Sequence, residues 1–205
     1  EDPFYNALTD LAPFEGVLPL TPVLDRYDVS QEKMVTTNKV DSKLDYYRIL
    51  TKTSHLNLTL GQTLSRQSFN SAIFQTLNGG QVQPLEETMP IDGLSESLIN
   101  DVLYGFSDTF LGVHYKFKSG KLTVSPGATL HRYGLVNEQA GVTLTQNQWL
   151  VLPDFLALID LKKSENIRFN YAVSAEYTDV NNYAQAYVFN NYNRLFRGNR
   201  ALENA

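Results

Sequence analysis

Alternation of apolar and polar residues is the feature that most constrains this chain. Between His55 and Leu64, leucines occupy almost every second position and are separated by residues such as Asn57 and Thr59. A period of two is typical of an extended strand that has one apolar and one polar face. The pattern recurs over residues 111–118, 122–130, 155–161 and 167–173. We therefore expect an all-β protein with antiparallel, up-and-down strands, in which residues 54–178 form hairpins.

Short polar segments between these runs predict tight turns at 65–68, 118–121 and 163–165. A two-residue turn at Ser119 and Gly120 pairs Phe117 with Leu122. A three-residue turn at 163–165 pairs Leu161 with Ile167. Both registers place the apolar stripes of the paired strands on one face, as a half-buried sheet requires.

The connections predict where the loops lie. Long polar stretches at about 78–106, 134–149 and from 179 onward alternate with the short turns, so we expect long loops at one end of the sheet. Four prolines before residue 23 argue against central strands there. We expect residues 1–205 to be part of one β domain, with 1–50 mostly loop or irregular and 179–205 a loop leading into a further strand.

Composition excludes several classes of protein. The chain has 205 residues, a formal charge of −5, and 17 lysines and arginines that are not gathered into runs, which argues against a nucleic-acid partner. It has no cysteine, which excludes disulfide scaffolds and thiolate metal sites. No stretch approaches the ~20 apolar residues that a membrane-spanning helix needs. The chain starts at Glu1 without methionine, and we expect it to be a fragment of a larger protein.

The strand pattern fits a bacterial outer membrane. Strands of about ten residues, tilted by roughly 45°, span an apolar band of about 25 Å, which is the lipid-facing belt of an outer-membrane barrel. Such barrels have a polar interior, short turns at one end, long loops at the other, and aromatic girdles. We expect the girdle residues to be Tyr104, Phe106, Tyr133, Trp149 and Tyr177.

A soluble β-sandwich that binds a glycan or a peptide is the alternative, because its strands alternate in the same way against a second sheet. A small, complete outer-membrane barrel is another. The one-sided loop lengths favour the segment of a large barrel. Leu60, Val113 and Phe169 distinguish a membrane barrel from a sandwich, because they face lipid in a barrel and a second sheet in a sandwich.

Three segments resemble a known family. They are Leu152-Pro153-Asp154-Phe155 with Ser164-Glu165-Asn166-Ile167-Arg168-Phe169-Asn170-Tyr171, then Leu122-Thr123-Val124-Ser125-Pro126-Gly127, and then Gly198-Asn199-Arg200-Ala201-Leu202-Glu203. Together they resemble barrel segments of the TonB-dependent outer-membrane receptors of Bacteroidetes-type bacteria. Gly198, Asn199 and Leu202 correspond to the family's Gly-Asn-Pro-x-Leu motif, in which Arg200 replaces the proline.

The resemblance implies a transmembrane barrel of about 22 strands, of which this chain supplies part of the wall and the extracellular loops. It implies a location in the bacterial outer membrane and contact with membrane lipid. It also implies an amino-terminal plug domain, TonB and a surface lipoprotein as partners, and uptake of a nutrient or a siderophore-like ligand.

The sequence carries no sign of catalysis. It lacks nucleotide-binding glycine patterns, a His-Glu-x-x-His helix and a hydrolase elbow, so we expect no enzyme, no catalytic residue and no cofactor. In the predicted register His114 faces Ser125 and His131 faces Asp108. The two histidines do not converge, so we expect no metal site.

Aromatic rings and amides alternate near the carboxyl end. The candidate ligand-binding residues are Tyr183, Tyr187, Asn190, Asn191 and Tyr192. Rings stack on apolar faces of sugars or peptides, and amides bond their hydroxyls and carbonyls. The alternative interpretation is an aromatic girdle beside a polar loop.

Overall fold

The structure is a computed structural model. It describes residues 14, 16–22, 27–90, 93–162, 164–175, 180–191 and 194–199, and the backbone of 4–8. Its elements are strands β1 (Phe4–Leu8), β2 (Tyr27–Thr51), β3 (Ser54–Thr76), β4 (Val82–Leu85), β5 (Asn100–Ser119), β6 (Leu122–Gln139), β7 (Val142–Lys162) and β8 (Glu165–Ala172), the 3₁₀ helix η1 (Val180–Tyr183), and strands β9 (Val188–Asn191) and β10 (Arg194–Phe196).

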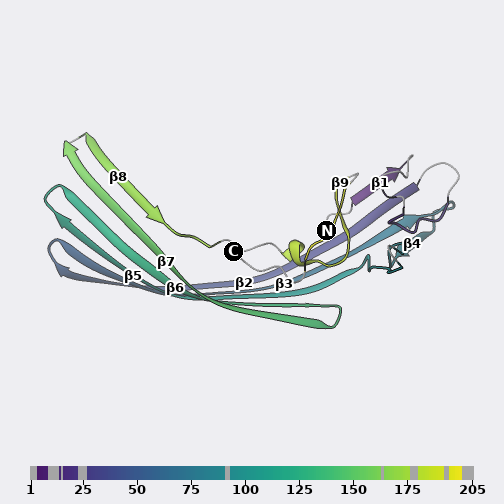
Figure 1. The fold of residues 1–205 in the computed structure, drawn as a ribbon, viewed down its shortest axis with the longest axis horizontal. Helices are drawn as coiled ribbons and strands as arrows, with labels where there is room; N and C mark the ends of the chain where they lie inside the picture. The colour runs from purple at the N-terminus through teal and green to yellow at the C-terminus, as the bar shows by residue number, and fades with distance from the viewer. Residues whose placement is uncertain are drawn as a thin grey trace.

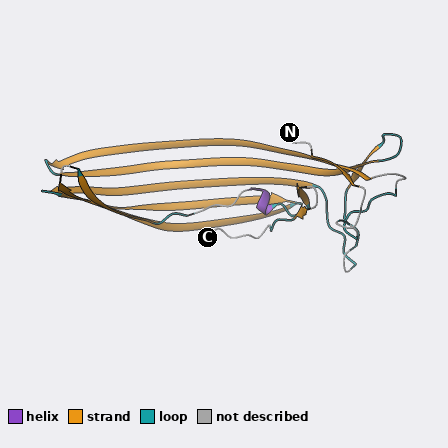
Figure 2. Cartoon of the chain, turned by 90° about the horizontal axis from the view of Figure 1, so that it is seen from above, coloured by secondary structure: helices purple, strands orange, loops and turns teal. Residues whose placement is uncertain are grey.

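One antiparallel sheet dominates the molecule. Its strand order is β1-β2-β3-β5-β6-β7-β8, with β4 pairing the far end of β3, while β9 and β10 form a separate pair. The strands run side by side over most of their length and the sheet curls into a half-barrel (Figures 1 and 2). The segment from η1 to β10 lies on the concave side, which we call the inner face (Figure 1). The expected all-β, antiparallel barrel segment is therefore confirmed.

The first fifty residues differ from the prediction. We expected them to be mostly irregular, but β2 occupies Tyr27–Thr51 and pairs with β3 along its whole length, from Asp28 opposite Thr76 to Thr51 opposite Ser54. The predicted turn at 65–68 is also wrong, because these residues continue β3. Residues 65–68 are all polar, so hydrogen bonds to β2 and β5 hold them in the sheet rather than an apolar stripe. The second half of β2 does carry apolar side chains, among them Val40, Leu44 and Tyr46 on one face.

The predicted hairpin registers are wrong by two residues. In the β5–β6 pair Phe117 lies opposite Val124 rather than Leu122, since the turn is formed by Gly120 and Lys121. In the β7–β8 pair Ile167 lies opposite Ile159 rather than Leu161. A shift of two keeps every side chain on its predicted face. The assignment of faces therefore holds although the pairing partners change.

The connections also differ in part. The turns at 52–53 and 120–121 and the short connection from β7 to β8 lie at one end of the sheet, which we call the short-turn end. At the opposite end a long connection that includes β4 joins β3 to β5, as expected, but residues 100–106 of the expected loop belong to β5. Residues 134–149, expected as a loop, instead extend β6 and β7 to a tight turn at Ala140 and Gly141, where φ is 50° and 72°. Positive φ at both positions is typical of the type I′ turn that joins twisted strands.

Candidate functional site

The outer face of the sheet carries a continuous row of apolar side chains. Leu44, Leu60, Leu111, Leu130 and Val151 are direct cross-strand neighbours from β2 to β7. With the exposed apolar residues around them they form what we call the apolar belt: Val40, Leu44, Tyr46, Leu60, Leu64, Leu111, Val113, Tyr115, Phe117, Leu122, Leu130, Trp149, Val151, Ile159, Leu161, Ile167, Phe169 and Tyr171. Along β6 it runs from Leu122 to Leu130, about the nine residues that a tilted strand uses to cross a bilayer.

The apolar belt has no protein covering among the described residues. Leu60 is 52% exposed, Val113 45% and Phe169 58%. A β-sandwich would bury these side chains against a second sheet. No second sheet of this kind lies on the apolar belt among the described residues.

The strands continue well beyond the belt toward the end opposite the short turns. β2 has 25 residues, β3 has 23 and β7 has 21, against the 9–11 that a bilayer requires. In these extensions the outer face also carries Met34, Leu103 and Val136, but most of its side chains are polar or small. They include Ser68, Asn70, Gly105, Ser107, Glu138, Thr145 and Asn147. The sheet is thus divided along its length into a belt and a polar projection.

Only part of the predicted girdle lies on the outer face. Trp149 does, with 63% exposure at the edge of the apolar belt, and the Arg132 guanidinium lies 5.8 Å from the centre of its ring. Tyr104 and Tyr133 are buried on the inner face, and Phe106 packs beside them, so the girdle prediction is wrong for these three. Their positions in the strands share the parity of the polar face. Tyr177 lies outside the described residues.

At the level of the apolar belt the inner face is mainly polar, although Tyr47, Ile49 and Leu158 also lie on it. Asp41 and Asp45 on β2 accept hydrogen bonds of 2.6 Å from Thr63 and Thr59 on β3, respectively. Lys39 and Lys43 lie 3.1 and 3.2 Å from the same two carboxylates. Each of these carboxylates is therefore paired with a lysine of its own strand and a threonine of the neighbouring strand, whereas the opposite face at this level is apolar.

One histidine bridges three strands of the inner face. His114 on β5, Gly127 on β6 and Asp154 on β7 are successive cross-strand neighbours, and His114 Nε2 lies 2.8 Å from Asp154 Oδ2. The missing side chain of Gly127 makes room for this bond, since a Cβ atom there would lie 2.1 Å from the His114 ring.

The second histidine lies within a stack of rings. His131 Nδ1 is 3.0 Å from both carboxylate oxygens of Asp108, although the direct partner of Asp108 in the ladder is Tyr133. The imidazole stacks between Phe110 and Tyr133, with centroid distances of 5.2 and 5.1 Å. Each histidine is thus bound to its own aspartate. Within the described ranges no three residues of the types that hold metals come together.

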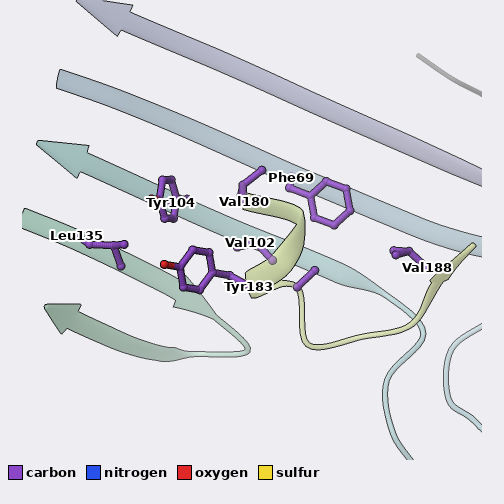
Figure 3. Close-up of a cluster of buried hydrophobic side chains, with 8 residues drawn as sticks. Phe69, Val102, Tyr104, Leu135, Val180, Tyr183 and Val188 are labelled. Atoms are coloured by element: carbon purple, nitrogen blue, oxygen red, sulfur yellow. The ribbon is translucent and has the colours of Figure 1, made fainter. Parts of the chain in front are cut away.

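Residues 180–191 and 194–199 cover the inner face of the polar projection. Val180, Tyr183 and Val188 pack onto Phe69, Val102 and other side chains of β3, β5 and β6 (Figure 3). We call residues 180–191 and 194–199 the inner segment. A second cluster places Phe189 of this segment against Phe14, Val29 and Ile73. Apolar burial therefore holds the inner segment on the sheet.

Buried amide side chains of the sheet also bind the backbone of the inner segment. Asn100 accepts a 3.0 Å hydrogen bond from the Ala186 amide and donates to its carbonyl at 3.3 Å. Gln139 accepts from the Gln185 amide at 3.0 Å and donates to the Tyr183 carbonyl at 2.8 Å. The Phe189 amide donates to Gln31 at 2.7 Å. The sequence pattern does not single out these amides, because they lie on a mostly polar strand face where an amide is an ordinary residue.

The structure separates the candidate ligand-binding residues. Tyr183 is fully buried and Tyr187 is half-buried beneath the Arg197 guanidinium, whereas Asn190 and Asn191 are exposed. Tyr192 lies outside the described residues. The arrangement makes Tyr183 a packing residue rather than a ligand contact, because a fully buried ring has no face left for a ligand.

Two residues of the Gly-Asn motif have a local structural role. The amides of Gly198 and Asn199 donate 2.8 Å hydrogen bonds to the carbonyls of Ala184 and Asn182. A Cβ atom at Gly198 would lie 2.3 Å from the Asn182 carbonyl oxygen, so this approach requires glycine. Arg197 forms an ion pair with Glu96. Leu202 lies outside the described residues.

Among the described residues, no helix is long and apolar enough to cross a membrane.

Comparison with known proteins gives one informative result. No family model and no curated protein sequence matches the chain. A solved structure does: the ferric citrate transporter FecA in its unliganded form, with a TM-score of 0.51 and 16% sequence identity over 73% of this chain. The match covers 22% of that transporter, so the chain spans about a fifth of its length. At this identity the likeness shows the fold alone, which is that of a β-barrel segment.

Proposed function

We propose that the chain forms part of the wall of a TonB-dependent receptor in a bacterial outer membrane. The observation that carries this proposal is the uncovered apolar belt on the outer face, opposite a polar inner face at the same level. The fold likeness to an outer-membrane transporter supports it.

The two ends of the sheet differ, and this difference indicates how the sheet is oriented in the membrane. Barrels of this kind have short turns in the periplasm and long loops outside the cell. The short-turn end then faces the periplasm, and the polar projection with its inner segment reaches beyond the outer surface. The inner face at belt level lines a lumen that water or a plug domain fills.

The motif resemblance extends the proposal to a receptor of the Bacteroidetes type. Its partners are then a plug domain and TonB within the intact receptor, a surface lipoprotein outside, and membrane lipid around the belt. The cargo is a nutrient or a siderophore-like ligand, and the chain contributes wall and loops without covalent catalysis. Asn190 and Asn191 are the exposed members of the candidate ligand set.

Spin labels placed on the two faces test the membrane assignment. We would attach labels one at a time at Leu60, Val113 and Phe169, and as matched inner-face controls at Thr59, Thr129 and Asn170, in the full-length protein in vesicles. Outer-face labels should be accessible to oxygen and shielded from a polar nickel chelate, with the reverse at the inner face. Ready access of the nickel chelate to the outer-face labels would overturn the proposal.

Transport requires its own test. Deletion of TonB should abolish energy-dependent uptake of the cargo by cells that express the full-length receptor. Uptake that continues unchanged would remove the receptor function and leave the membrane assignment standing.

A further inference from the structure

Positive charge is concentrated at the short-turn end. The segments 48–57, 116–125 and 159–168, which surround the three turns, hold eight of the 17 lysines and arginines but only two of the 22 aspartates and glutamates. Their formal charge is +6, in a chain whose total is −5. The turns are far apart in the sequence, and only the folding of the sheet brings these residues to one end.

Three of the basic residues lie on the outer face or in the turns of the short-turn end. Arg48 is the cross-strand neighbour of Leu56, which neighbours Tyr115, so its side chain leaves the sheet on the apolar face. Lys52 and Lys121 occupy turns, and all three side chains are exposed. Lys121 Nζ also donates to the Leu161 carbonyl at 2.8 Å, which holds it against the end of β7. We call Arg48, Lys52 and Lys121 the basic rim.

The basic rim adjoins an apolar surface that ends in aromatic rings. Tyr46, Tyr115 and Phe117 are exposed on the outer face in the last residues before the turns. Aromatic rings beside lysine and arginine are typical of the boundary between hydrocarbon and head groups. Basic side chains at that boundary attract anionic head groups.

We infer that the basic rim binds the phosphate head groups of anionic phospholipids in the leaflet that surrounds the short-turn end. This inference rests on the proposed function, because it requires the apolar belt to lie in a bilayer. Two observations favour lipid as the occupant: the rim continues the apolar belt, and its charge is opposite to that of the head groups. Each basic residue near such a surface contributes about a five-fold gain in association.

A second basic set on the inner face provides a matched control. Lys116, Lys118 and Arg168 lie at the same end with exposed side chains, but they project toward the lumen. Lys118, Thr123, Leu158 and Arg168 form one cross-strand row. Replacing either set with glutamine removes three charges, so the two variants remove equal charge, one from the inner face and the other from the turns and the outer face.

The experiment measures lipid selectivity. The full-length protein would be reconstituted in phosphatidylcholine vesicles that contain about one-fifth phosphatidylglycerol. The association of spin-labelled phosphatidylglycerol is then compared with that of spin-labelled phosphatidylcholine. We expect a several-fold preference for phosphatidylglycerol that falls to about one in the variant R48Q/K52Q/K121Q and persists in K116Q/K118Q/R168Q. Raising the salt concentration to about 1 M should weaken the preference, since it shortens the range of exposed charges to about 3 Å.

Two outcomes would overturn the inference, and a third would count against the proposed function. Loss of selectivity only in K116Q/K118Q/R168Q would overturn the inference, because the lipid selectivity would then come from the inner-face set and not from the basic rim. Equal binding of both lipids by the unaltered protein would also overturn it while leaving the barrel in place. Failure of the protein to insert into phosphatidylcholine vesicles would instead count against the proposed function.

Discussion

His114 on β5 and Asp154 on β7 hydrogen-bond across an intervening strand, with 2.8 Å between Nε2 and Oδ2. Neighbouring strands lie about 4.8 Å apart, so the pair spans two such spacings above Gly127. Three strands of the wall are thereby connected through side chains as well as through backbone hydrogen bonds.

Replacing Gly127 with alanine should therefore destabilise the barrel. The new Cβ would meet the His114 ring at 2.1 Å and Asp154 at 2.8 Å, so the hydrogen bond must break or the strands must shift. We expect the free energy of unfolding to fall by about 1–3 kcal/mol, as for other overpacked sites. Denaturant unfolding of the full-length protein in vesicles measures it.

Gly105→Ala is the matched control, because a Cβ there has no atom closer than 3.8 Å. It should change the free energy of unfolding by less than about 0.5 kcal/mol. Equal losses in the two variants would show that the effect comes from backbone conformation and not from the His114–Asp154 bridge.

Neighbouring residues of β8 provide a test of the two faces. Phe169 is 58% exposed on the outer face, and Asn170 is exposed on the inner face. In a bilayer, Phe169→Arg should reduce the free energy of unfolding by about 1–4 kcal/mol, depending on depth, because it places a charge in hydrocarbon. Asn170→Arg should cost little, since its side chain lies in water.

Folding titrations of both variants in vesicles give the comparison. If the two arginines cost the same, the outer face does not meet lipid. The same pair in detergent micelles, which adapt around a charge, should show a smaller difference than in vesicles.

The sequence predicts the faces of this sheet better than its strand boundaries. Leu60, Val113 and Phe169 lie on the predicted face because the two-residue period of a strand survives any register shift of two. Residues 65–68 and 134–149 were predicted as turn and loop because they carry no apolar stripe. They form strands because their backbones hydrogen-bond to neighbours that are distant in sequence.

The inner segment shows a feature that the local sequence pattern does not predict. Tyr183 reads as a ligand contact in a run of rings and amides, but the structure buries it against Phe69 and Tyr104. Which rings are buried depends on how a loop folds back onto a sheet that precedes it by many residues. The local pattern of Tyr and Asn does not contain that information.

Truncation of Tyr183 should release the inner segment. The side chain is completely buried, and its ring centre lies 5.3 Å from that of Tyr104. Tyr183→Ala should weaken the docking of the segment by about 3–5 kcal/mol, through lost burial and the cavity left behind. Hydrogen exchange of the amides of residues 184–189 would then accelerate while exchange in β5 and β6 remains slow.

Gln185→Ala in the same segment is the control, because its side chain is exposed. It should leave exchange unchanged. Acceleration throughout the sheet in Tyr183→Ala would contradict a local role and indicate that the segment supports the barrel as a whole.

Asn100 offers a test of the amide contacts that is independent of apolar packing. Its side chain pairs with both the amide and the carbonyl of Ala186, and both residues are buried. Asn100→Leu keeps the approximate volume but leaves two buried backbone groups without these partners, each costing about 1–3 kcal/mol. Exchange of the Ala186 amide should rise by at least about ten-fold, because 1.4 kcal/mol corresponds to a factor of ten. Asn190→Leu, on the exposed side of the same segment, should leave that exchange rate unchanged. If Asn100→Leu leaves it unchanged as well, apolar burial alone holds the inner segment on the sheet and the paired amides contribute nothing to its docking.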